Sequence, residues 1–145
     1  MRVVDANVLL YAVNTAADHH EQSRQWLEDA LNGADRVGFS WNVLIAFLRT
    51  STHHALLSSP LSVEEATAQV ESWLSSPHAT IVSPGPQHLH HLTGLLARTG
   101  TGGNLTNDAQ LAALALENRA DIVSYDNDFT RFPGVTWKTP ERLSS

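Results

Sequence analysis

Short apolar runs alternate with longer segments of helical character along the whole chain, and this alternation constrains the fold more than any other feature. The runs cover residues 2–5, 36–39, 79–83, 121–125 and 135–138, and each has the length of a strand. Alternating strands and helices favour a parallel sheet that is covered on both faces. We therefore expect an α/β fold, with a central parallel β-sheet of four to five short strands flanked by helices on both faces.

The segments between these runs have helical lengths and helix-start signals. Ser40 is a candidate N-cap, and Ser62 with Glu65 makes a capping-box pattern. Thr106 is a third candidate N-cap, after the glycine-rich break at 100–103. No repeat, low-complexity tract or long linker interrupts the pattern, so we expect residues 1–145 to form one domain. The expected helices cover residues 7–14, 19–31, 41–54, 63–74, 87–99 and 107–117.

Composition narrows the class of protein. No apolar run approaches the roughly 18 residues that a membrane span requires, and Asp5 and Asn7 interrupt the first run, so we expect no span and no signal peptide. The chain contains no cysteine, which excludes disulfides, thiol catalysis and thiolate metal sites. These features are compatible with a reducing compartment, and we expect a cytoplasmic protein.

Three aspartates occupy positions at which an α/β sheet gathers its ligands. Asp5 and Asp126 each follow an apolar run, and Asp108 lies at the start of an Ala/Leu-rich helix. Because the carboxyl ends of parallel strands meet in one crevice, we expect these carboxylates to converge. Such a cluster is stable only when a carboxylate is protonated or a cation lies among them. Hard oxygen ligands favour Mg²⁺ or Mn²⁺, so Asp5, Asp108 and Asp126 are predicted metal ligands and catalytic acids.

Each acid also has a purely structural interpretation. A helix N-terminus favours Asp108, and a turn favours Asp126. Asp128 is either an outer metal ligand or a cap for the turn into Phe129. Asn7 and Ser124 are candidates for orienting the carboxylates through hydrogen bonds, or are an ordinary cap and strand-end residue.

The net charge of −6 has the wrong sign for a protein that coats nucleic acid. Any contact with nucleic acid is therefore expected to be local, through a bound metal and a few arginines. Arg49, Arg98 and Arg131 are the candidates for phosphate contact, and a salt bridge or a solvated position is the alternative for each.

The histidines and the large aromatic residues are expected to have structural roles. His88 and His91 are one helical turn apart, but no segment has the His and Glu spacing of a hydrolytic zinc helix. We expect packed or solvated histidines instead. The aromatic residues expected in the core or at an interface, rather than as base-stacking platforms, are Trp26, Trp41, Phe47 and Trp73.

Three segments together resemble PIN domains. They are residues 3–11 around Asp5, residues 108–115, and residues 124–129 around Asp126. Residues 132–140 are similar to the C-terminal strand of that family. Their order and spacing, and the total length, resemble most the VapC-type toxins of bacterial toxin–antitoxin pairs, over essentially the whole chain.

The resemblance implies a PIN-like fold and a Mg²⁺- or Mn²⁺-dependent endoribonuclease that cleaves structured RNA and arrests translation. It implies a VapB-type antitoxin as partner, and a homodimer. It also assigns metal binding to Asp5, Asp108 and Asp126, which match the acids of the family one by one.

Ala46 is the main departure from the family pattern. The family usually carries a Glu in the helix that here begins near Trp41, and Ala46 occupies the matching position. One metal ion is then expected to bind firmly, and a second only together with RNA phosphate. The departure also keeps open a catalytically weak or inactive PIN-like module that binds RNA or an antitoxin.

Two other functions use related chemistry. A nuclease acting on flap or single-stranded DNA needs a similar acidic site, but the small size argues against it. A phosphatase-like hydrolase needs a D-x-D pattern near the N-terminus, and position 7 is Asn. If the toxin interpretation holds, we expect a partner to cover an apolar groove of the early helices. The candidate wall residues are Trp26, Leu27, Leu31, Leu44 and Phe47.

Overall fold

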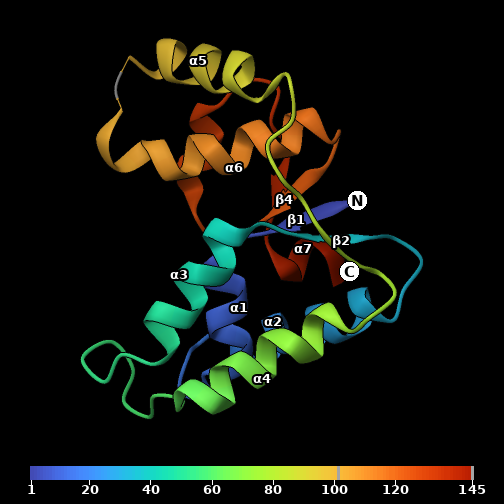
Figure 1. Cartoon of the computed structure of the whole chain (residues 1–145), viewed down its shortest axis with the longest axis vertical. Coiled ribbons are helices and arrows are strands. Elements are labelled where there is room, and N and C mark those ends of the chain that lie inside the picture. The colour runs from blue at the N-terminus through green and yellow to red at the C-terminus, as the bar shows by residue number, and fades with distance from the viewer. Residues whose placement is uncertain (101, 145) are drawn as a thin grey trace.

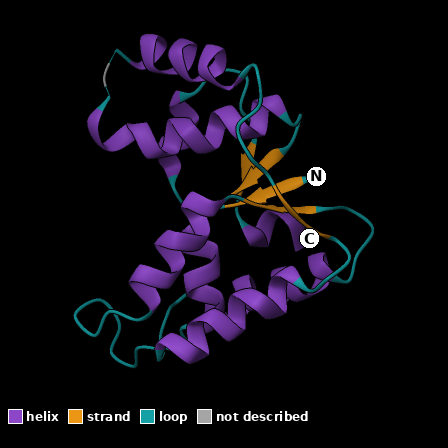
Figure 2. Cartoon of the chain, in the orientation of Figure 1, coloured by secondary structure: helices purple, strands orange, loops and turns teal. Residues whose placement is uncertain are grey.

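The computed structural model describes residues 1–100 and 102–144, and a five-stranded parallel sheet lies at its centre (Figures 1 and 2). The order of strands across the sheet is β3-β2-β1-β4-β5. The strands are β1 (Arg2–Val4), β2 (Val37–Phe39), β3 (Ala79–Ile81), β4 (Asp121–Val123) and β5 (Trp137–Lys138). The predicted α/β class and the parallel sheet are confirmed.

The order of the strands places the switch point of the sheet between β1 and β4. From β1 the chain proceeds outward through β2 to β3, and it then returns to the other side of β1 to form β4 and β5. Val4 pairs with Val123, and the Asp5 backbone N–H donates to the Val123 carbonyl at 3.0 Å. Ligand sites of open α/β sheets lie at such a point, outside the carboxyl ends of the strands.

Helices cover both faces of the sheet. Figure 1 shows α5 and α6 on one face, and α1 to α4 together with α7 on the other. Among the described residues there are also two short 3₁₀ turns, η1 (Gly103–Leu105) and η2 (Asn127–Arg131). The helices are α1 (Ala6–Val13), α2 (His20–Leu31), α3 (Trp41–Ser51), α4 (Val63–Leu74), α5 (His88–Thr99), α6 (Thr106–Glu117) and α7 (Pro140–Ser144). In the part of the chain that the structure describes, none of them is long and apolar enough to cross a membrane.

Two of the three predicted helix caps are confirmed. The Val43 N–H donates to Ser40 Oγ at 3.2 Å, and Ser62 and Glu65 form a reciprocal capping box. The third prediction is wrong, because Thr106 already has helical dihedral angles, with φ −62° and ψ −43°. The turn η1 runs directly into α6, so this helix begins without a side-chain cap.

One core joins the sheet to the helices on both of its faces. Phe47 from α3 is fully buried, and its ring meets Trp73 of α4 edge-on with 4.9 Å between the ring centroids. Trp26 and Leu44 are buried in the same core. Trp41 was expected in the core or at an interface, and its 53% exposure excludes the core.

The predicted wall residues of the partner groove need correction. Trp26, Leu44 and Phe47 are buried in the core and are not in the lining of the groove between α2 and α4. Leu27 and Leu31 do line a groove of about 850 Å³ between α2 and α4. The prediction assigned the apolar faces of these helices to a partner protein. In the structure, most of these side chains are buried in the core of the domain instead.

Candidate active site

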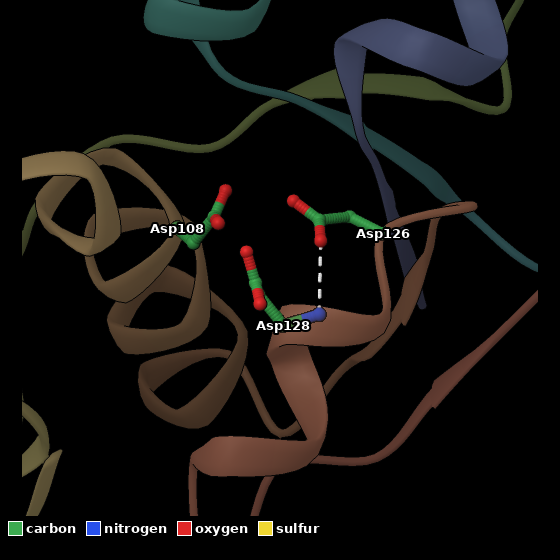
Figure 3. Close-up of side chains that lie close together, drawn as sticks. All are labelled: Asp108, Asp126 and Asp128. Atoms are coloured by element: carbon green, nitrogen blue, oxygen red, sulfur yellow. Dashed lines mark hydrogen bonds between the residues drawn. The ribbon is translucent and has the colours of Figure 1, made fainter.

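Three aspartates from two segments, the η2 turn and the start of α6, meet at the carboxyl edge of the sheet. Asp126 follows β4, Asp128 lies in the first turn of η2, and Asp108 lies in the first turn of α6. One carboxylate oxygen from each lies within 4.8 Å of the others, and Figure 3 shows the three side chains pointing into a shared space. In the described residues no second group of three or more His, Cys, Asp or Glu side chains comes so close together.

A short turn holds Asp126 and Asp128 together. Asp126 is the N-cap of η2, and its Oδ1 accepts a hydrogen bond from the Asp128 backbone N–H at 2.9 Å. The buried ring of Phe129 anchors the turn from below. The capping interpretation of Asp128 is wrong, because Asp126 supplies the cap, and the Asp128 carboxylate is directed into the cluster (Figure 3).

Asp5 lies at the end of the neighbouring strand and is held by several donors. Its Oδ1 accepts from the Ala6 backbone N–H at 2.8 Å, which makes it the N-cap of α1. Its Oδ2 accepts from Ser124 Oγ at 2.7 Å and from Asn7 Nδ2 at 3.3 Å. These bonds fix the Asp5 carboxylate at the end of β1. Asp5 was predicted to converge with Asp108 and Asp126, but it is not in the group within 4.8 Å, where Asp128 is the third member.

Ser124 links the two strand-end acids. Its fully buried hydroxyl donates to Asp5 and accepts from the Asp126 backbone N–H at 3.0 Å. Asn7 Nδ2 donates to the same hydroxyl at 3.1 Å, and Asn7 Oδ1 accepts from the Tyr125 N–H. One hydroxyl and one amide thus set the position of Asp5 relative to Asp126.

The cluster carries more negative charge than its surroundings offset. Burial, followed by the charges of Asp126, Asp5 and Asp128, raises the pKa of Asp108 from 3.8 to about 7. Burial also raises the pKa of Asp5, against the hydrogen bonds from Ser124 and Ala6. Arg131 offsets part of the charge, because its Nε lies 3.6 Å from Asp128 Oδ1.

These residues fit a divalent cation. All donors are hard carboxylate oxygens, and opposite ligands of an octahedral Mg²⁺ are about 4 Å apart, close to the spacing in the cluster. A cation would also relieve the repulsion that raises the pKa of Asp108.

A pocket of about 270 Å³ opens beside the acids, between α3 and α6. Asp5 and Asp108 line it from one side, and Ala46 and Arg49 line it from α3. Ala46 therefore faces the site, as the expected register required, but brings no ligand. The polar residues of the lining that sequence reasoning missed are Asn42, Asn107 and Gln110.

A positional signal for these three residues was present in the sequence. Asn42 lies one helical turn before Ala46, and Asn107 and Gln110 lie close to Asp108. Arg98 and Arg131 were the other two candidates for phosphate contact. Arg131 borders the cluster, whereas Arg98 lies exposed in the last turn of α5, outside the pocket lining.

Comparison with known proteins assigns the family. The PIN domain profile matches residues 2–135. The chain belongs to the PIN domain family. This PIN domain is 55% identical to Ribonuclease VapC37 of Mycobacterium tuberculosis over 143 residues, which cover 99% of each chain. It is 42% identical to Ribonuclease VapC33 of the same species, over 98% of this chain and 99% of that one.

Solved structures show the same fold. VapBC2 from Rickettsia felis, bound to a DNA fragment from its promoter, superposes with a TM-score of 0.70 at 20% identity, over 95% of this chain and 97% of that chain. M. tuberculosis VapC20, described as a Sarcin-Ricin loop cleaving toxin, gives 0.67 at 16% identity, over 94% and 99%. The recognised PIN family and the VapC relationship are confirmed.

The raised pKa of Asp108 predicts that the metal-free PIN domain loses stability as the pH rises from about 4 to about 7. Over this range the folded state retains a proton that the unfolded state releases, so ionisation disfavours folding. Solvent screening at this half-exposed group reduces the effect to about 1 kcal/mol, or about 2–4 °C in Tm. Thermal unfolding in EDTA at pH 5 and pH 7.5 measures it, with Asp108→Asn as the control. An identical pH dependence for the two proteins would contradict this origin.

Proposed function

We propose that this PIN domain is a Mg²⁺- or Mn²⁺-dependent endoribonuclease toxin of a type II toxin–antitoxin module, and that it cleaves structured RNA. The observation that carries the proposal is the convergence of Asp108, Asp126 and Asp128 within 4.8 Å. The VapC ribonucleases to which the chain is 55% and 42% identical support the same activity.

Different residues of the chain would bind the metal ion and position its ligands. Asp108 and Asp126 would hold the ion, with Asp128 as an additional ligand and Asp5 beside them. A bound Mg²⁺ or Mn²⁺ supplies an activated water and stabilises the charge that develops on the phosphodiester. The hydrogen bonds of Ser124 and Asn7 would hold Asp5 and Asp126 in fixed positions relative to each other.

Two arginines are positioned for RNA phosphate. Arg49 lines the pocket from α3, opposite the acids. Arg131 borders Asp128 and is 59% exposed. Both therefore lie where a phosphate chain entering the site would pass, and Arg98 remains a more distant candidate for the same role.

The direct test is cleavage of a labelled structured RNA by the purified protein. We expect new 5′ ends with Mg²⁺ or Mn²⁺, no cleavage in excess EDTA, and recovery when Mn²⁺ is restored. A DNA oligonucleotide of the same sequence is the matched control. Undiminished RNA cleavage in EDTA would contradict the metal requirement, and preferred DNA cleavage would favour the alternative nuclease.

The second candidate is a PIN-like module that binds RNA or an antitoxin but cuts weakly or not at all. The observation that favours it is the methyl side chain of Ala46 in the pocket. The convergence of three acids, with Asp5 close enough for its charge to help raise the pKa of Asp108, supports the enzyme instead.

Ala46→Glu is expected to tighten Mn²⁺ binding, because it adds a carboxylate on the α3 side of the pocket. Added repulsion should lower the metal-free Tm, while the stabilisation by Mn²⁺ should grow. Calorimetric titration and thermal unfolding measure both, and Ala46→Gln controls for side-chain size. Equal affinity and equal stability for Glu and Ala would show that position 46 does not reach the ion.

We propose a VapB-type antitoxin as the partner, and a homodimer as the assembly. The groove between α2 and α4 is lined by the half-buried Leu31 and, beneath it, by Leu27, which is 2% exposed, and it has polar residues such as Arg24 and Glu28 at its rim. Such a mixed lining suits an amphipathic helix. We also propose that the chain is a single domain, and one core that extends from Val3 to Phe132 supports this. A cytoplasmic location without membrane contact is a further part of the proposal.

A further inference from the structure

The short segment between β4 and the acidic cluster directs three successive side chains to three different partners. The hydroxyl of Ser124 donates to Asp5, and the carboxylate of Asp126 points into the cluster (Figure 3). Between them, the side chain of Tyr125 extends to the first turn of α7, where its hydroxyl donates to Glu141 Oε1 at 2.8 Å. Helix α7 is thus bonded to the residue that directly precedes Asp126.

Several side chains hold the ring and hydroxyl of Tyr125 in place. The His19 ring stacks on the tyrosine ring, with 4.2 Å between the centroids and 20° between the planes. The Tyr11 ring of α1 lies tilted against it at 5.3 Å. Ser23 of α2, which is fully buried, donates to the Tyr125 hydroxyl at 3.3 Å. The tyrosine is therefore held by α1, α2 and α7, which cover the face of the sheet opposite to α6 (Figure 1).

Glu141 is an ionised acceptor for this hydroxyl. Partial burial acts to raise the pKa of Glu141, but the hydrogen bonds from its own backbone N–H and from Tyr125 outweigh burial and lower the pKa. His19 Nδ1 lies 3.3 Å from the same Oε1. A hydrogen bond to a charged group is stronger than one between neutral groups. The bond between Tyr125 and Glu141 therefore anchors the segment firmly to α7.

The backbone around Tyr125 is tied to the groups that hold Asp5. The Tyr125 N–H donates to Asn7 Oδ1 at 3.2 Å, and the amide nitrogen of Asn7 donates to Asp5. The Asp126 N–H donates to Ser124 Oγ at 3.0 Å. These bonds hold the segment at two backbone N–H groups, and the tyrosine hydroxyl holds it at a third point. A shift of the backbone that carries Asp126 must therefore disturb the charged hydrogen bond to α7.

We propose that Tyr125 and Glu141 are positioning residues for Asp126, so that α7, which lies outside the pocket lining, sets the metal affinity of the acidic cluster. This inference rests on the proposed metal-dependent function. A ligand binds its metal tightly when neighbouring hydrogen bonds hold it in the coordinating orientation, and loss of such a support costs about 10- to 100-fold in affinity. Because Tyr125 acts on Asp126 through the backbone, the expected effect is at the lower end of this range.

A purely structural role of this network predicts a different result. If the bond between Tyr125 and Glu141 only stabilised the fold, its loss would lower the Tm and leave the Mn²⁺ affinity of the folded protein unchanged. Affinity measured where every variant is folded therefore separates positioning from stability.

The test is calorimetric titration of the full chain with Mn²⁺, at a temperature at which thermal unfolding shows each variant to be folded. Tyr125→Phe removes the hydroxyl but keeps the ring against His19, and its Mn²⁺ affinity should fall about tenfold. Glu141→Ala removes the acceptor and should fall equally, whereas Glu141→Gln retains an acceptor oxygen and should stay within about threefold of wild type. Tyr125→Phe combined with Glu141→Ala should be no weaker than either change alone, because both remove the same bond.

Tyr11→Phe is the matched control. It removes a hydroxyl from the neighbouring ring, and that hydroxyl makes no hydrogen bond within the part of the chain that the structure describes. We expect wild-type Mn²⁺ affinity for this variant. An equal loss of affinity in Tyr11→Phe and Tyr125→Phe would assign the effect to loosened packing and overturn the positioning role.

Cleavage of RNA by the wild type with Mn²⁺, measured in parallel, separates this inference from the proposed function. Cleavage by the wild type together with unchanged Mn²⁺ affinity in Tyr125→Phe overturns the positioning role and leaves the ribonuclease standing. A tenfold loss of affinity in Tyr125→Phe, with rescue in Glu141→Gln but no cleavage by the wild type, supports the positioning role and contradicts the ribonuclease.

Discussion

Asp126→Asn is expected to reduce RNA cleavage at least about a hundredfold, because the loss of one ligand charge removes several kcal/mol of metal-dependent stabilisation. Asn retains the Oδ1 that accepts the Asp128 N–H, so the turn η2 should survive the change. The fold is therefore expected to remain, with a Tm equal to or above that of the metal-free wild type. The initial rate of cleavage of a labelled RNA with Mg²⁺ is the measurement.

Asp121→Asn is the matched control for this prediction. Asp121 is the first residue of the same strand, β4, and lies at the amino ends of the strands, away from the acidic cluster. Its backbone N–H donates to the Met1 carbonyl. The same change of charge there should leave the cleavage rate unchanged. Rates for Asp126→Asn within about threefold of wild type would place the chemistry elsewhere.

Phe47→Ala is expected to lower the free energy of unfolding by about 3–5 kcal/mol, since it opens a cavity in a packed core. Phe47 is fully buried and packs against the Trp73 ring at 4.9 Å. Such a loss is a large part of the stability of a small domain. Urea unfolding in EDTA measures it without a contribution from bound metal.

Ile45→Ala is the control on the same helix, and its 52% exposure predicts a cost below about 1 kcal/mol. Phe47→Leu provides a milder core change if the alanine variant does not fold. If Phe47→Ala proves as stable as Ile45→Ala, then Phe47 faces a surface, and the assignment of the α3 core face is wrong.

The sheet was predictable from the sequence because its inner strands β1, β2 and β4 are buried apolar runs, and the partly exposed edge strands β3 and β5 still have strand-length apolar segments. Each predicted run contains an observed strand, and Ser40 and Ser62 mark helix starts correctly. The meeting of Asp108 with Asp126 follows from the same logic, since strand ends and helix starts share one edge of the sheet. The position of Asp126 as a cap that also faces the cluster depends on the η2 turn, which has no periodic signal.

The faces of helices were less predictable. Leu44 and Phe47 on α3 are buried, whereas Trp41 on the same helix is exposed, and all three are apolar. An apolar side chain favours burial, but packing against α4 and the sheet decides which face of α3 is buried. Thr106 has the chemistry of a cap, but the preceding 3₁₀ turn already continues the helix. Such outcomes depend on tertiary neighbours that lie far away in sequence.

Location of Mn²⁺ by anomalous diffraction from crystals of the wild-type protein tests the central claim most directly. The account predicts a peak bounded by carboxylate oxygens of Asp108 and Asp126, with Asp128 adjacent, at distances of about 2–2.5 Å. The peak should be absent from Asp126→Asn crystals prepared in the same way. An Mn²⁺ peak away from these aspartates, or none in a wild-type protein that cleaves RNA with Mn²⁺, would contradict the proposed site.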